Sequence, residues 1–100
     1  MGIQIVQINY KLEGSREKYV EENLPYAQPI ADVPGLRWKV WTINAARGEA
    51  GGVYLFEDQA SMQAFLAGEI VTEMKGDPSL SIKTFDVIEE LTTTTRGPIN

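Results

Sequence analysis

One segment restricts the fold of this chain more than any other: residues 34–56, PGLRWKVWTINAARGEAGGVYLF. Two stretches within it, 36–43 and 52–57, are rich in β-branched and aromatic residues, and a short loop with glycines joins them. A link this short pairs two strands antiparallel, because a parallel return needs a longer crossover. The segment therefore predicts a β-hairpin. Its two tryptophans, tyrosine and phenylalanine indicate a ligand pocket as well as core packing.

Residues 3–10, IQIVQINY, and residues 80–89, LSIKTFDVIE, predict two further strands with apolar side chains on both faces. Between the first strand and the hairpin, Ser15 predicts the N-cap of a helix. Pro25 and Pro29 predict a kink or a break near residues 24–25. Four apolar residues at helical spacing form the stripe expected to pack on the sheet: Val20, Leu24, Ala27 and Ala31.

A second helix is expected after the hairpin, beginning at Asp58 and running to about residue 75, where Gly76, Asp77 and Pro78 end it. Its inward stripe is expected to consist of small and apolar residues with Phe65 beside them: Ala60, Ala64, Ala67, Val71 and Met74.

The resulting order, βαββαβ, predicts an α+β protein: a ferredoxin-like sandwich in which both helices cover one face of an antiparallel sheet. We expect one domain over residues 1–91 and a polar C-terminal tail, 92–100, that is frayed or reaches over a neighbouring subunit. Strands that are apolar on both faces would leave a large exposed patch on the other side of the sheet. A homodimer, closed sheet to sheet as a dimeric α+β barrel, would cover it.

Composition removes several kinds of chemistry. The 100 residues contain no cysteine and no histidine, so thiolate nucleophiles, histidine bases and haem or zinc ligation by these residues are excluded. The net charge of −5 disfavours nucleic acid as a partner. No stretch approaches a membrane span, and no leader sequence is visible, so we expect a cytoplasmic protein with no membrane partner. The paired glutamates at 21–22 and 89–90 look solvated, and no metal site is expected.

Side chains alternate along the strand 36–43, which predicts two faces: Leu36, Trp38 and Val40 on one, and Arg37, Lys39, Trp41 and Ile43 on the other. Arg37 and Trp41 would then lie about 13 Å apart on one face, at ~3.3 Å per residue, and could bracket a ring system. The same residues also suit structural roles, since aromatic side chains pack in cores and exposed cations are usually solvated or ion-paired.

Three strings, PGLRWKVWT at 34–42, EAGGVYLF at 49–56 and FDV at 85–87, resemble the YdhR-type family of monooxygenases, and the resemblance spans nearly the whole chain. It implies a homodimeric α+β barrel related to the antibiotic-biosynthesis monooxygenases, small enzymes that oxygenate polycyclic phenols without metal, flavin or haem. Quinone-forming members of that group use an Asn-x-x-x-Trp pair on the corresponding strand. This chain has Arg37-x-x-x-Trp41, so the tryptophan carries over and the asparagine does not.

The function predicted on this basis is cofactor-independent monooxygenation of a small cyclic or polycyclic aromatic or phenolic substrate with dioxygen. Such a reaction needs a dry aromatic pocket, a group that favours the substrate anion, and donors for an oxygen-derived anion. We expect Arg37 and Trp41 to be catalytic. Four residues are expected to bind substrate: Trp38, Lys39, Tyr54 and Phe56. A non-catalytic small-molecule binding or sensing homodimer of the same fold is the alternative.

Two other functions fit the sequence less well. The RNA-recognition motif shares the βαββαβ order, but Glu49 and Gly51 stand where its third strand requires base-stacking aromatics. Gly48, Gly51 and Gly52 suggest a phosphate loop, but no Gly-Lys-Ser/Thr follows them, so they are interpreted as hairpin and bulge glycines.

Overall fold

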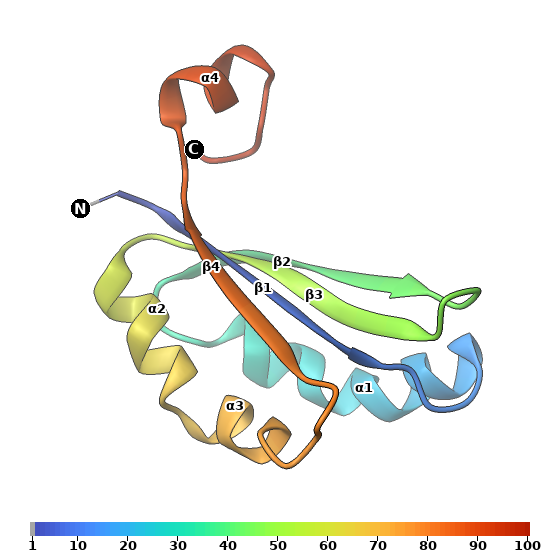
Figure 1. The fold of residues 1–100 in the computed structure, drawn as a ribbon. Coiled ribbons are helices and arrows are strands. Elements are labelled where there is room, and N and C mark those ends of the chain that lie inside the picture. The colour runs from blue at the N-terminus through green and yellow to red at the C-terminus, as the bar shows by residue number, and fades with distance from the viewer. Residues whose placement is uncertain (1) are drawn as a thin grey trace.

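The computed structural model describes residues 2–100 and confirms the α+β, ferredoxin-like architecture (Figure 1). Four strands form one antiparallel sheet in the order β2-β3-β1-β4. The elements, in chain order, are β1 (Gln4–Lys11), α1 (Arg16–Ala31), β2 (Leu36–Asn44), β3 (Glu49–Phe56), α2 (Gln59–Leu66), α3 (Glu69–Met74), β4 (Ser81–Asp86) and α4 (Glu89–Thr94). No helix within residues 2–100 is long and apolar enough to cross a membrane.

Helices α1, α2 and α3 all lie on one side of the sheet, which we call the helix-covered face (Figure 1). Its core consists of alternate strand residues, among them Val6, Ile8, Tyr54 and Phe56, packed against Phe65 of α2. The ring centroids of Tyr54 and Phe65 lie 5.1 Å apart, and those of Phe56 and Phe65 lie 5.3 Å apart. These contacts hold helix to sheet, because aromatic pairs bury large apolar areas in defined orientations.

The opposite side of the sheet is the open face, formed by residues such as Ile5, Val40, Val53 and Phe85. Val40 is 54% exposed and Phe85 is 47% exposed, so much of this apolar surface meets solvent in one chain. Only the C-terminal segment rises on this side, where α4 stands clear of the sheet (Figure 1). The bare second face that the sequence predicts is therefore present.

Both predicted helix caps are confirmed. Ser15 accepts a hydrogen bond from the backbone N–H of Lys18, and Asp58 accepts one from the N–H of Ser61. Helix α1 is unbroken from Arg16 to Ala31 despite Pro25 and Pro29, so the predicted break is absent. Both prolines are exposed, and water can satisfy the carbonyls that lose their N–H partner there.

The predicted inward stripe of α1 is wrong by one residue. Val20 and Leu24 are exposed, and the residues turned to the sheet are Tyr19, Asn23 and Ile30. One residue corresponds to 100° around a helix, which moves the whole stripe to another side. The four predicted positions are more apolar than the observed ones. The stripe of α1 that contacts the sheet nevertheless includes side chains with polar ends, such as Tyr19 and Asn23.

The second predicted helix is two helices, because it is interrupted at Gly68, which caps the start of α3. Glycine inside a helix costs about 1 kcal/mol relative to alanine, so a break there is inexpensive. The predicted stripe is confirmed at Val71 and at the neighbouring Phe65, which are buried. It is wrong at the three alanines, Ala60, Ala64 and Ala67, which are exposed, while Met62 is buried instead. Burial follows side-chain size here more than the spacing of the alanines.

The C-terminal residues are folded back and not frayed. Residue 91 falls inside α4, and beyond that helix Ile99 is buried against Ile3 and Leu55. The indole N–H of Trp38 donates to the carbonyl of Pro98 at 2.7 Å, and the Arg37 guanidinium donates to the carbonyl of Ile99. Two side chains of β2 therefore hold the end of the chain.

Candidate functional site

The candidate site begins with an irregularity in β2. Leu36 pairs with Phe56, but Trp38 pairs with Leu55, so Arg37 is an extra residue in a β-bulge. After the bulge, Lys39 pairs with Tyr54 and Trp41 with Gly52, which places Lys39 and Trp41 on the helix-covered face. The expectation that Leu36 shares a face with Trp38 is therefore wrong, because the bulge resets the alternation.

The bulge also separates Arg37 from Trp41. The Arg37 guanidinium reaches Ile99, whose side chain is buried with Leu55 on the open face, while Trp41 lies on the helix-covered face. The expected arrangement, in which these two residues bracket a ring from one face, is not present. Whether Arg37 takes part in catalysis stays a prediction.

Lys39, Trp41 and Tyr54 are brought together at the centre of the hairpin. Nζ of Lys39 lies 3.2 Å from the centroid of the Trp41 ring and 4.6 Å from that of Tyr54. Burial lowers the pKa of Lys39 to about 7. Burial also raises the pKa of Tyr54, which therefore keeps its proton at neutral pH. A lysine with a lowered pKa between two aromatic rings is a typical feature of functional sites.

A cavity of about 210 Å³, which we call the Trp41 cavity, opens beside this group between the sheet and helices α1 and α3. Its walls are mainly aromatic and aliphatic, with a few polar groups: Tyr10, Asn23, Tyr26, Ile30, Lys39, Trp41, Ile70, Glu73 and Met74. A second cavity of about 200 Å³ adjoins it, and both are lined by Asn23 and Trp41. Apolar walls with a small number of polar groups are what small-molecule sites require.

Two tyrosine hydroxyls supply hydrogen-bonding groups near Trp41. The hydroxyls of Tyr10 and Tyr19 are hydrogen-bonded to each other, and the two residues line the first and the second cavity respectively. Burial, with the Tyr10 hydrogen bond as a further cause, raises the pKa of Tyr19. The Asn23 amide donates to the backbone carbonyl of Tyr19 at 2.9 Å, which fixes its orientation. Uncharged donors of this kind suit an anion that forms in the cavity.

The other two predicted substrate-binding residues lie elsewhere. Trp38 is on the open face and binds the C-terminal segment. Phe56 is fully buried in the core, stacked 6.4 Å from Tyr54. Their predicted contact with substrate is untested, but of the six predicted site residues the structure gathers Lys39, Trp41 and Tyr54.

Sequence reasoning missed Tyr10 on β1 and three residues on α1: Tyr19, Asn23 and Tyr26. A signal for the helical set was available, because these three residues recur at spacings of four and three and place polar tips on one helix face. The purely apolar stripe beside them was the more conventional choice.

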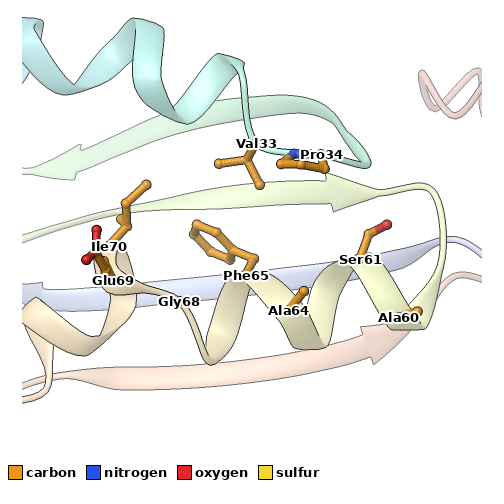
Figure 2. Close-up of a pocket in the computed structure, with 9 residues that line it drawn as sticks. All are labelled: Val33, Pro34, Ala60, Ser61, Ala64, Phe65, Gly68, Glu69 and Ile70. Atoms are coloured by element: carbon orange, nitrogen blue, oxygen red, sulfur yellow. The ribbon is translucent and has the colours of Figure 1, made fainter.

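A larger cavity of about 520 Å³ lies between α2 and the turn before β2 (Figure 2). Its walls come from Val33, Pro34, Ala64 and Phe65, and the two polar side chains, Ser61 and Glu69, lie at opposite ends (Figure 2). No polar groups converge there, so this cavity does not provide the arrangement that orients a reacting ligand. Within residues 2–100, no group of three or more acidic residues is placed to hold a metal ion.

The sheet order, the helices on one face and the aromatic cavity between them define a ferredoxin-like α+β protein with an aromatic-lined cavity under its helices. The chain belongs to the family described as "Putative mono-oxygenase ydhR", whose model matches residues 5–98. The family resemblance in the sequence is thereby confirmed. A comparison with curated proteins gives no match.

Solved structures support the fold. SnoaB, a cofactor-independent oxygenase from Streptomyces nogalater, superposes with a TM-score of 0.67 at 11% identity, over 88% of this chain and 95% of that one. A protein of unknown function from Nitrosomonas europaea gives 0.66 at 19% identity, over 88% and 91%. A heme-degrading protein from Mycobacterium tuberculosis gives 0.63 at 16% identity, over 88% and 94%. At these identities the likeness establishes the fold.

Proposed function

We propose that this monooxygenase-family protein oxygenates a small aromatic or phenolic substrate with dioxygen and without a metal, flavin or haem. The observation that carries the proposal is the Trp41 cavity, where aromatic walls surround a lysine amine and tyrosine hydroxyls. Membership of the family supports the reaction class. The cofactor-independent oxygenase among the structural neighbours supplies a precedent for the reaction on this fold.

The cavity volume suits a substituted aromatic ring. An apolar cavity of about 150 Å³ in another protein takes up benzene. The Trp41 cavity, at about 210 Å³, offers more room, and the adjoining space of about 200 Å³ would accept a second fused ring or a substituent. Trp41 lies at the junction of the two spaces, so its ring is the expected stacking partner for a flat ligand.

The chemistry follows from what such a site supplies. A deprotonated phenol is electron-rich enough to pass an electron to dioxygen, whereas the neutral phenol is much less so. The residues of this chain therefore have to favour the anion, exclude water and stabilise the oxygen-derived anion that follows. Tyr10 and Tyr19 are the candidate donors, and Lys39 is the candidate charge.

We also propose that the protein acts as a homodimer in the cytoplasm, with the open face of each sheet against its partner. Val40, Phe85, Ile88 and Leu91 supply exposed apolar surface on that side, which a second copy would bury. In such a barrel Arg37 and Trp38 would lie near the subunit boundary, where the C-terminal segment ends.

Oxygen consumption tests the proposal. Dihydroxynaphthalenes and hydroxyanthraquinones are offered to the protein in an oxygen electrode, with and without a chelator. Uptake that persists with chelator supports the mechanism, and uptake abolished by chelator contradicts it. Saturable quenching of tryptophan fluorescence without any oxygen uptake would favour the non-catalytic binding dimer.

Arg37→Met, which keeps the aliphatic stem and deletes the charge, tests the predicted catalytic role of Arg37: a loss of about 10²-fold in turnover supports that role.

A further inference from the structure

Lys39 is held in an unusual position for a lysine. Its stem crosses β3 at Gly52, where a Cβ atom would lie 2.5 Å from Cε of Lys39. Its amine then lies over the Trp41 ring at 3.2 Å and near the Tyr54 ring at 4.6 Å. The absence of a side chain at residue 52 is thus what lets the amine reach the wall of the Trp41 cavity.

Nothing neutralises this amine. In the part of the chain that the structure describes, the ion pair present joins Arg47 and Glu49, and Lys39 takes part in none. An ammonium buried without a carboxylate loses hydration, and burial accordingly lowers the pKa of Lys39 to about 7. Near neutral pH the amine is therefore present both with and without its proton. The neutral form carries a lone pair that accepts a hydrogen bond or a proton.

We propose that Lys39 is the general base of this site, and that the ligand it selects is a phenol. The O–H bond of the phenol breaks, its proton forms the third N–H bond of the Lys39 ammonium, and the electron pair stays on the phenolate oxygen. The ammonium then remains beside the anion it has produced. This inference rests on the proposed function for its reaction, but the proton transfer needs only the bound phenol.

The neighbouring titratable groups are compatible with this role. Tyr10 on β1, Tyr19 and Tyr26 on α1, and Tyr54 on β3 carry phenolic hydroxyls, and burial raises the pKa of Tyr19 and of Tyr54. These two therefore stay neutral while Lys39 titrates. Glu73 of α3 lines the same cavity, but it is exposed and makes no ion pair with Lys39. Burial alone accounts for the lowered pKa of Lys39.

The number of protons released on binding distinguishes a Lys39 that acts as a base from a Lys39 that acts only as a fixed positive charge. The probe is 3-nitrophenol, whose phenolate form has its own absorbance band. The measurement is made at a pH just above the Lys39 pKa of about 7, where the amine is mostly neutral. At this pH the free probe is also mostly neutral. Calorimetry in two buffers of different ionisation enthalpy counts the protons released. For the wild type we expect a phenolate spectrum with little proton release, because the amine keeps the proton. Lys39→Arg should give the phenolate spectrum with about one proton released, and Lys39→Met a neutral-phenol spectrum.

Lys75 is an exposed lysine just after α3, so Lys75→Met is the matched control and should behave like the wild type. Any of four results would overturn the proposal. The wild type would show the spectrum of the neutral phenol, release a full proton, or fail to bind 3-nitrophenol, or Lys39→Met would give the same spectrum as the wild type. With an oxygen-consuming substrate, kcat/KM should rise with pH through about 7, and Lys39→Met should lose about 10²-fold to 10⁴-fold. Intact proton transfer without oxygen uptake would refute the oxygenase function and leave the base in place.

Discussion

The two faces of the sheet are built from the same four strands, yet they differ in what covers them. The helix-covered face is packed by α1, α2 and α3 and buries Tyr54 and Phe56 almost completely. The open face leaves Val40 and Phe85 about half exposed. Alternation along a strand supplies apolar residues to both faces, so the pattern alone does not distinguish a core from a docking surface. What distinguishes them is that helices of the chain pack against one face and leave the other largely uncovered.

The two faces also differ in their polar groups. On the helix-covered face, polar tips gather at one place, beside Trp41, where α1 stands off the sheet enough to leave a cavity. On the open face, Trp38 gives its N–H to the C-terminal segment. The candidate site therefore lies on the helix-covered face, and the proposed homodimer would use the open face. Four experiments test these differences and the capping of α2.

The largest effect is expected for a core aromatic residue. Phe56→Ala should lower the free energy of unfolding by about 3–5 kcal/mol, because it leaves a cavity among packed rings. Phe85→Ala, measured at a protein concentration where the chain is monomeric, should cost less than about 1 kcal/mol, since the side chain is already half exposed. Urea unfolding gives both values. Equal losses in the monomer would remove the difference between the faces.

Assembly should respond to a charge placed on the open face. Phe85→Glu should weaken dimerisation by at least about 2 kcal/mol, or roughly 30-fold in the dissociation constant, because a carboxylate would be buried without a partner. Ala46→Glu, in the exposed β2–β3 loop, is the control. Sedimentation equilibrium measures both. A wild-type chain that remains a monomer at high micromolar concentration would contradict the dimer itself.

The position of the Lys39 stem is tested through Gly52. Gly52→Ala places a methyl group 2.5 Å from Cε of Lys39, which is too close for both to stay, and the flexible lysine side chain would move aside. We expect the affinity for a phenol to fall about tenfold, which corresponds to about 1.4 kcal/mol. The pKa of Lys39 should return toward its ordinary value. Gly76→Ala is the control, because a Cβ there meets nothing within 4 Å. Fluorescence titration and NMR titration of the lysine amines provide the two readouts, and an unmoved pKa would show that the stem does not depend on Gly52.

The smallest effect concerns the cap of α2. Hydrogen bonds from Ser61 lower the pKa of the Asp58 carboxyl in the folded protein. A carboxyl with a lowered pKa contributes stability above its unfolded value, and that contribution is lost as pH falls through the folded value. Asp58→Asn keeps a capping side chain but does not titrate in this range. Its melting temperature should therefore fall less than that of the wild type on acidification below about pH 4. If the melting temperatures of the wild type and Asp58→Asn fell equally with pH, the Asp58 cap would not contribute to the loss of stability in acid.

Much of the fold could be predicted because its signals are local. Ser15 and Asp58 mark helix starts through their capping side chains. The link between the hairpin strands, predicted over 44–51 and observed over 45–48, is short enough to fix their antiparallel pairing. The order of elements then leaves few topologies. The facing of α1 was predicted wrongly, because the correct stripe carries hydroxyl and amide groups and the stripe beside it is more apolar. The Tyr19 hydroxyl finds its partner, the hydroxyl of Tyr10, only when α1 packs on the sheet.

The candidate site was predictable in part. The hairpin segment contains Lys39, Trp41 and Tyr54, and its aromatic content drew attention to them. The predicted sharing of one face by Arg37 and Trp41 is wrong because a β-bulge interrupts the regular alternation of β2. A bulge depends on how two strands pair with each other and contact the C-terminal segment. No residue type at 36–38 predicts it.

That bulge has a consequence for aligning this chain with its relatives. Deleting Arg37 would leave the pairing of Leu36 with Phe56 and of Trp38 with Leu55 in register, so the residue behaves structurally as a one-residue insertion. Counting back four positions from Trp41 therefore reaches the inserted residue. The position that shares the face of Lys39 and Trp41 is Leu36, five positions back. An alignment that places residue 37 at a regular strand position would therefore equate an inserted residue with one that points to a defined face of the sheet.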